Sequence, residues 1–104
     1  MMHEQLGLST EQPDVQEVFN YWAGTMQKRK PLLGPARRAR LTWSIKHYGV
    51  EACKQAIDGC KLDRYAMGHN KTKRKHNDIL DIFRNEKSIE EYIERAEEIN
   101  DEDW

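Results

Sequence analysis

The sequence contains few cysteines, glycines and prolines and has no long apolar run. Two cysteines among 104 residues cannot build a disulfide scaffold, so we expect a reducing, cytoplasmic environment. Six glycines and three prolines exclude collagen-like and linker-type repeats. No apolar stretch approaches the roughly 20 residues of a membrane span. The first residues also lack the basic start and apolar core of a signal peptide. We therefore expect a small, soluble domain that makes no contact with a membrane.

Charge is abundant and unevenly distributed. The formal net charge is only −1, but residues 27–76 carry 14 lysines and arginines against three acids, a net charge of +11. Residues 1–26 carry −4, and residues 77–104 carry −8. A basic middle between acidic ends indicates a polyanionic partner, although helices can also carry such charges simply as a solvated face. Nine aromatic residues argue against a disordered chain.

Apolar residues recur at helical spacing and never with the two-residue period of a strand. The sequence predicts an all-α fold, a compact bundle of about five short helices with a long basic loop. We expect a flexible arm over residues 1–13, a single helical domain over 14–99 and an acidic tail over 100–104. The expected core includes Phe19, Trp22, Trp43, Ile57 and Phe83.

Several residues mark the expected helix ends. The first helix is predicted to begin at Asp14 and to stop before Pro31, which cannot continue a helix. Pro35 is favoured at the first position of a second helix, and Gly49 is a good residue for its C-cap. Ser88, with a glutamate three residues later, matches a capping box for the last helix.

Two basic blocks form the candidate site. The first block flanks a predicted turn, with residues 28–30 before it and residues 37–40 after it. The second block lies in the loop over residues 61–76. Lysine and arginine bind phosphates with release of counterions, and an aromatic ring can stack on a base. We therefore predict a nucleic-acid interface, in which Tyr65 and Asn70 contact a base or sugar. Its members are Lys28, Arg29, Lys30, Arg37, Arg38, Arg40, Arg64, Tyr65, Asn70, Lys71, Lys73, Arg74 and Lys75.

Other functional classes find little support. The helix–Gly49–helix outline invites a helix-turn-helix, but Gln55 and Asp58 stand where that motif needs apolar residues. Cys53 and Cys60 lie two turns apart and are expected to be buried, and no spacing typical of a zinc site accompanies them. No nucleophile elbow, P-loop or paired-carboxylate pattern is present, so we predict neither an enzyme nor a cofactor nor a metal site.

A family resemblance rests on short strings that follow one another in order. They are Val18-Phe19-Asn20-Tyr21-Trp22, Leu33-Gly34-Pro35-Ala36-Arg37-Arg38-Ala39-Arg40, Tyr48-Gly49-Val50, Ala56-Ile57-Asp58-Gly59-Cys60, Met67-Gly68-His69-Asn70 and Asp78-Ile79-Leu80-Asp81-Ile82-Phe83-Arg84-Asn85. Over residues 15–95 the chain resembles the C-terminal helical domain of phage and prophage replication proteins of the replisome-organiser type. The resemblance implies DNA binding and contact with the helicase-loading machinery, in the cytoplasm of a bacterial host cell.

The chain departs from that family in several respects. The family domain normally follows a winged-helix domain that these 104 residues do not include. The string over residues 71–75 is also more basic than the family pattern. The leading expectation is a phage replication protein that binds nucleic acid, with DNA as the expected target. The alternative is a module that binds or inhibits a replicative helicase or its loader through the acidic helix at 88–99 and the tail. The residues favour neither strand form and no particular oligomeric state.

Overall fold

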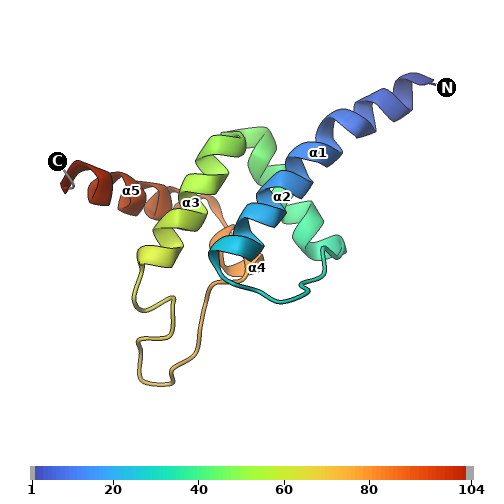
Figure 1. Ribbon diagram of the computed structural model, residues 1–104. Helices are drawn as coiled ribbons and strands as arrows, with labels where there is room; N and C mark the ends of the chain where they lie inside the picture. Colours follow the sequence, from blue (N-terminus) through green and yellow to red (C-terminus); the bar gives the residue numbers. More distant parts are fainter. Residues whose placement is uncertain (1, 103–104) are drawn as a thin grey trace.

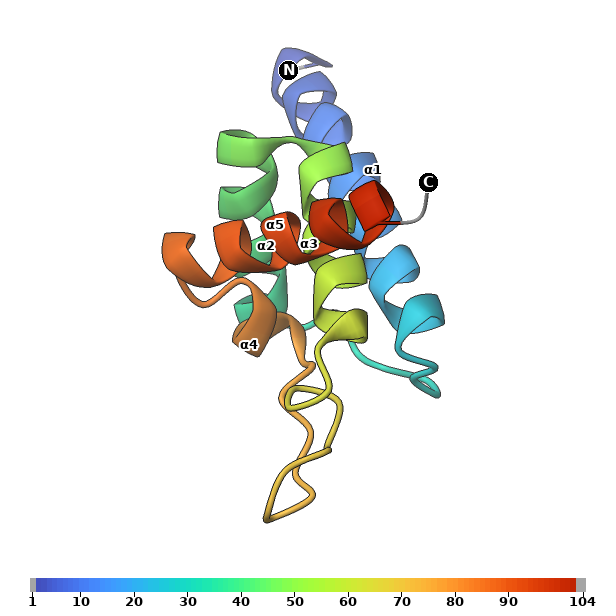
Figure 2. The ribbon, with the colours of Figure 1, turned by 90° about the vertical axis from the view of Figure 1, so that its left-hand side faces the viewer.

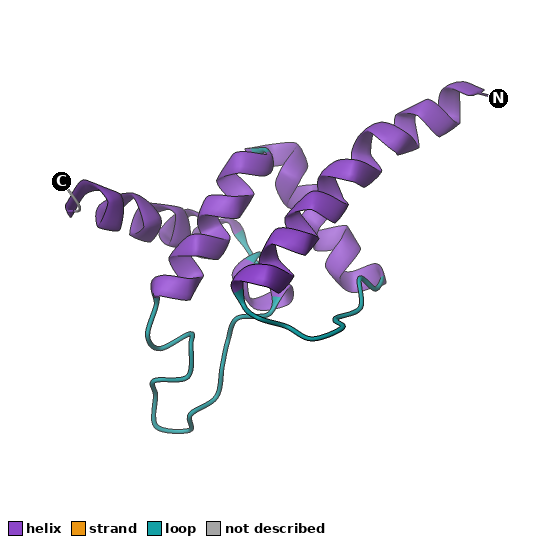
Figure 3. Cartoon of the chain, viewed as in Figure 1, coloured by secondary structure: helices purple, strands orange, loops and turns teal. Residues whose placement is uncertain are grey.

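The computed structural model describes the backbone of residues 2–102 and the side chains of residues 13–98. Within that part, the chain forms five helices and no β-strand, which confirms the all-α prediction (Figures 1 and 3). The helices are α1 (Met2–Thr25), α2 (Pro35–Tyr48), α3 (Val50–Leu62), α4 (Ile79–Ile82) and α5 (Glu86–Glu102). No helix in this part of the chain is both long and apolar enough to cross a membrane.

Helix α1 differs from the prediction at both ends. It begins at Met2 rather than Asp14 and contains Pro13, so most of the expected arm is helical. It ends at Thr25, because Gln27 adopts a left-handed backbone with φ of 56°. The N–H of Gln27 donates to the carbonyl of Gly24, and the N–H of Lys28 donates to that of Ala23. These two bonds form a Schellman motif, which stops the helix well before Pro31.

Helices α2 and α3 have the predicted boundary signals. Pro35 is the first residue of α2, and Gly49 caps its C-terminus, where its N–H donates to the carbonyl of Ile45. Gly49 has φ of +92°, a conformation that residues with a side chain rarely adopt. This single glycine turns the chain directly from α2 into α3.

The caps of the last two helices correct one expectation. Asp78 and Asp81 form a reciprocal capping box at the start of α4. The box predicted at Ser88 is wrong, because α5 begins at Glu86. Asn85 takes the capping role one turn earlier, where its Oδ1 accepts from the N–H of Ser88. The buried Ser88 hydroxyl instead donates to the carbonyl of Ile82.

The core lies between α1, α2, α3 and the two C-terminal helices. Trp22 and Phe83 are its largest fully buried side chains, and Trp43 is only half-buried at its edge, which corrects the expectation that Trp43 is a core residue. Helix α5 crosses α3 closely (Figure 2). The two backbones come close together at Gly59, which has no side chain to separate the helices. The buried apolar residues are Val15, Val18, Phe19, Trp22, Met26, Leu41, Cys53, Ala56, Ile57, Cys60, Ala66, Ile79, Ile82, Phe83, Ile89 and Ala96.

Two non-helical segments leave the bundle at the same end. Residues 26–34, the connecting loop, join α1 to α2, and residues 63–78, the hairpin loop, join α3 to α4. Both follow the C-terminal ends of their preceding helices, and the hairpin loop projects away from the bundle (Figures 1 and 2). The two basic blocks of the sequence thus lie at the same end of the molecule.

Candidate nucleic-acid interface

The hairpin loop has an ordered internal structure. Met67 and Lys75 form an isolated antiparallel bridge, and the N–H of His76 donates to the carbonyl of Ala66 at 2.7 Å. Gly68 has φ of +101° and allows the turn that follows the bridge. The two arms of the loop therefore run antiparallel and present the residues between them at the tip.

Asn70 fixes the tip of the hairpin loop. Its Nδ2 donates to the carbonyls of Tyr65 and Arg74, at 2.9 and 2.8 Å. Its Oδ1 accepts from the N–H and the hydroxyl of Thr72 and from the N–H of Arg74. The sequence predicted that Asn70 contacts a base or sugar. Because the amide already makes five bonds within the loop, its role in the structure is to hold the loop in shape.

The first arm of the loop is anchored to α5 through Asp63. One carboxylate oxygen of Asp63 accepts from the N–H of Ala66 at 3.0 Å, and the other lies 3.8 Å from a guanidinium nitrogen of Arg95. The second arm is anchored to α1, where the Trp22 indole donates to the carbonyl of Asn77 at 2.8 Å. Lys28 also donates to the side chain of Asn77. Both roots of the hairpin loop are therefore attached to the bundle.

Arg37 and Arg40 have structural roles that the sequence did not predict. Arg37 donates to Asp78 at 2.5 Å and to the carbonyl of Leu32, and its guanidinium lies 5.0 Å from the centre of the Trp22 ring. Arg40 donates to the carbonyls of Phe83 and Arg84, the groups left unpaired where α4 ends. The two arginines thus bind groups of this chain, and we leave them out of the interface.

Asp78 supplies a negative charge to the basic cluster around Arg37. Burial of its carboxylate opposes ionisation, but the hydrogen bonds from Arg37 and from the Leu80 N–H outweigh it and hold the pKa of Asp78 below its usual value. Lys28 adds a further positive charge nearby. Arg38 is half-buried and also interacts within the chain. The half-buried cations of this part of the surface therefore already have partners within the chain.

The remaining basic side chains are exposed. Five belong to the hairpin loop and two to the connecting loop. Among the residues that the structure describes, no carboxylate forms an ion pair with any of them. The only acids of the hairpin loop, Asp63 and Asp78, are already bound to Arg95 and Arg37. The exposed cations are Arg29, Lys30, Arg64, Lys71, Lys73, Arg74 and Lys75.

An exposed aromatic ring lies among these charges. Tyr65 is 62% exposed, and its ring stacks on that of His76 with centroids 5.4 Å apart and planes 11° from parallel. An open hollow beside Tyr65 is also lined by Asn70, Lys71 and Thr72. The sequence identified Tyr65 as a base contact but missed His76. No sequence signal joins the two, because they are paired by the fold of the hairpin.

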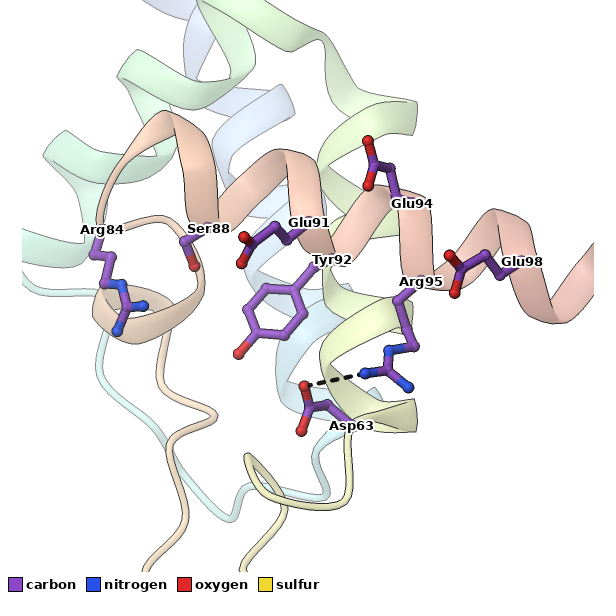
Figure 4. Close-up of a pocket in the computed structure, with 8 residues that line it drawn as sticks. All are labelled: Asp63, Arg84, Ser88, Glu91, Tyr92, Glu94, Arg95 and Glu98. Carbon is purple, nitrogen blue, oxygen red and sulfur yellow. Dashed lines mark ion pairs between the residues drawn. The ribbon is translucent and has the colours of Figure 1, made fainter.

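A second concave surface lies between α5 and the start of the hairpin loop (Figure 4). It has mixed charge, with the ion pair between Asp63 and Arg95 across it and glutamates of α5 along its rim. Tyr92 points into it, and burial, followed by nearby negative charge, raises the pKa of its hydroxyl. The residues lining it are Asp63, Arg84, Ser88, Glu91, Tyr92, Glu94, Arg95 and Glu98.

Cysteine and metal chemistry are not indicated in the described part of the chain. Cys53 and Cys60 are buried free thiols, as expected from the sequence, and burial raises the pKa of each to about 12. Within residues that the structure describes, no three His, Cys, Asp or Glu side chains gather where they could hold a metal ion.

Comparison with known proteins gives no further guide to function. No protein-family model, no curated protein and no solved structure matches this chain.

Proposed function

We propose that this protein binds nucleic acid, with DNA as its target, through the exposed cations of the hairpin loop and the connecting loop. The observation that supports this proposal is the arrangement of the loop itself. Five of its cations are exposed, while its two carboxylates are bound by arginines elsewhere in the chain. A phosphate backbone is the partner that such a surface fits best.

The rigidity of the hairpin loop strengthens the proposal. A floppy basic loop must become ordered when it binds, and this ordering opposes binding. Here the bonds of Asn70 and the bridge between Met67 and Lys75 already hold the backbone. The loop is therefore already ordered before it binds phosphates, and its backbone loses little conformational freedom on binding.

The biological setting that we propose is phage or prophage DNA replication. This part of the proposal rests on the resemblance to the C-terminal domain of replisome-organiser proteins. The hairpin loop contains one of the strings that carry this resemblance, Met67-Gly68-His69-Asn70. Within this string, Gly68 allows the turn of the loop and Asn70 binds its backbone. The string therefore maintains the loop conformation that exposes the cations.

The proposal is tested by fluorescence anisotropy with labelled DNA. The affinity should fall steeply between about 50 and 200 mM salt, because binding releases counterions. Replacing Lys73 and Lys75 with glutamine should lower the slope of log affinity against log salt by about 1.4–1.8, since each phosphate contact contributes about 0.7–0.9. The matched control replaces Lys46 and Lys87, which are exposed on α2 and α5.

The control variant carries the same change in net charge outside the two loops. If both variants bind alike, the cations of the hairpin loop do not form the interface. If the unaltered chain fails to bind DNA at about 50 mM salt, where phosphate contacts are strongest, the proposed function is wrong. RNA of the same length tests the choice of DNA, which is refuted if RNA alone is bound.

A second candidate function is docking onto a basic protein surface through α5. It is favoured by the exposed glutamates of that helix and by the concave surface beside them. A replicative helicase or its loader is the partner that the resemblance implies. Such docking should survive the glutamine substitutions in the hairpin loop and fail when Glu91, Glu94 and Glu98 are changed to lysine.

A further inference from the structure

The exposed ring of Tyr65 has a support that an isolated surface tyrosine lacks. His76 covers one face of the ring nearly in parallel, with 5.4 Å between centroids. The backbone of His76 is in turn fixed, because its N–H donates to the carbonyl of Ala66. With 62% of the residue exposed, Tyr65 presents the rest of its ring to solvent in a fixed orientation.

The surroundings of this ring suit a nucleotide. The hollow beside it is lined by Lys71, whose ammonium can pair with a phosphate, and by Thr72. Arg64 and Lys73 are exposed on the same loop. A base that stacks on Tyr65 would therefore have cations of the same loop available for the phosphates of its own strand. Every base has a flat aromatic face, so such a platform selects no particular sequence.

Resting on the proposed function, we infer that the target is single-stranded DNA, and that one unpaired base stacks on the ring of Tyr65. In a duplex each base is already covered by its neighbours, and its flat face is out of reach of a protein ring unless the base is flipped out. A single strand offers that face freely. The exposed lysines and arginines bind the phosphates of either form, so Tyr65 is the feature that distinguishes a single strand from a duplex.

The test combines a change in the protein with a change in the DNA. Tyr65→Ala removes the platform, and Tyr65→Phe retains the ring without the hydroxyl. The DNA probes are an oligothymidine strand, an abasic strand with the same number of phosphates, and a duplex of the same length. Because Tyr65 is exposed, neither variant should unfold, and a circular dichroism melt of each confirms this before binding is measured.

The unaltered chain should prefer the oligothymidine strand to the duplex. Tyr65→Ala should weaken binding to that strand by about 5- to 150-fold, the effect of losing one stacked base, and Tyr65→Phe should bind like the unaltered chain. On the abasic strand, which has no base to stack, Tyr65→Ala should have no effect.

Three results count against the inference, and they are distinguishable. If the unaltered chain binds the duplex as tightly as the single strand, the preference is wrong while the phosphate interface stands. If Tyr65→Ala weakens binding to abasic and oligothymidine strands equally, the ring does not stack on a base. If the unaltered chain binds none of the probes at low salt, the proposed function fails together with the inference.

Discussion

A side chain at position 59 would separate α3 from α5, the two helices that pack most extensively against each other. A Cβ atom added to Gly59 would lie 1.8 Å from the carbonyl oxygen of Tyr92 and 2.6 Å from its carbon. Those atoms belong to the backbone of α5, so no side-chain rotation can relieve the contact. To reach a separation of 3.0 Å, α5 must move away from α3 by about 1.2 Å. We therefore expect Gly59→Ala to destabilise the fold.

The size of the effect follows from two opposing terms. Alanine favours a helix over glycine by about 0.5–1 kcal/mol. Overpacking a core costs about 1–3 kcal/mol, and contact between two backbones lies at or above the upper end. Moving α5 also loosens the fully buried Ile89, whose burial is worth about 1.5–3 kcal/mol in full. We expect a net loss of about 2–3 kcal/mol, which lowers the melting temperature by about 10–20 °C.

Gly24 provides a matched control for this substitution. It lies near the end of α1, and a Cβ atom added there meets nothing within 4 Å. Gly24→Ala should therefore stabilise the protein by about 0.5–1 kcal/mol, through helix propensity alone. Urea and thermal unfolding followed by circular dichroism measure both variants. Melting of Gly59→Ala at or above the temperature of the unaltered chain would refute the packing argument.

Two further predictions concern ionisable groups. Asp78→Asn should destabilise the protein by about 1–2 kcal/mol at neutral pH, because Arg37 loses a charged partner. Since folding lowers the pKa of Asp78, its ionised form stabilises the fold above the unfolded pKa of about 4, and the difference between the two proteins should disappear as pH falls through the lower, folded pKa. Urea unfolding at a series of pH values measures this, and a constant difference down to pH about 2 contradicts it. Cys53 and Cys60, whose thiol pKa burial raises to about 12, should react with a thiol reagent at neutral pH only as fast as the protein opens, and rapidly in urea. Rapid modification of the native protein would show that the thiols are accessible.

The helical part of the fold could be predicted because its signals are local. The three- and four-residue spacing of apolar residues gave the class, and Pro35 and Gly49 gave two helix boundaries. The failures involved competition between neighbouring signals. Pro31 was a plausible stop for α1, but Gln27, without the glycine that usually marks this position, ends the helix first. Ser88 matched a capping box, but Asn85 caps α5 one turn earlier.

The candidate site was harder to predict, because its geometry depends on contacts between distant segments. An asparagine in a loop looks the same in the sequence whether it contacts a nucleotide or binds its own loop. Only the fold shows that Asn70 donates to carbonyls of its own loop. The stacking of Tyr65 on His76 joins residues eleven apart across a hairpin. The partner of Arg37 is Asp78, which is 41 positions away. No spacing rule covers such pairs.

Charge counting treats every cation of the basic middle alike, and the structure separates them by what they contact. Lys28 and Arg37 lie within 5.8 and 5.0 Å of the Trp22 ring, at the root of the hairpin loop. Arg40 closes the end of α4. These half-buried cations hold the loop and the helix that follows it in place, and the loop in turn displays its exposed cations. Removing a charge of the first kind should lower stability and, through the loop, binding, whereas removing one of the second kind should lower binding alone. Measuring stability and affinity on the same variants therefore separates the two sets, which net charge does not.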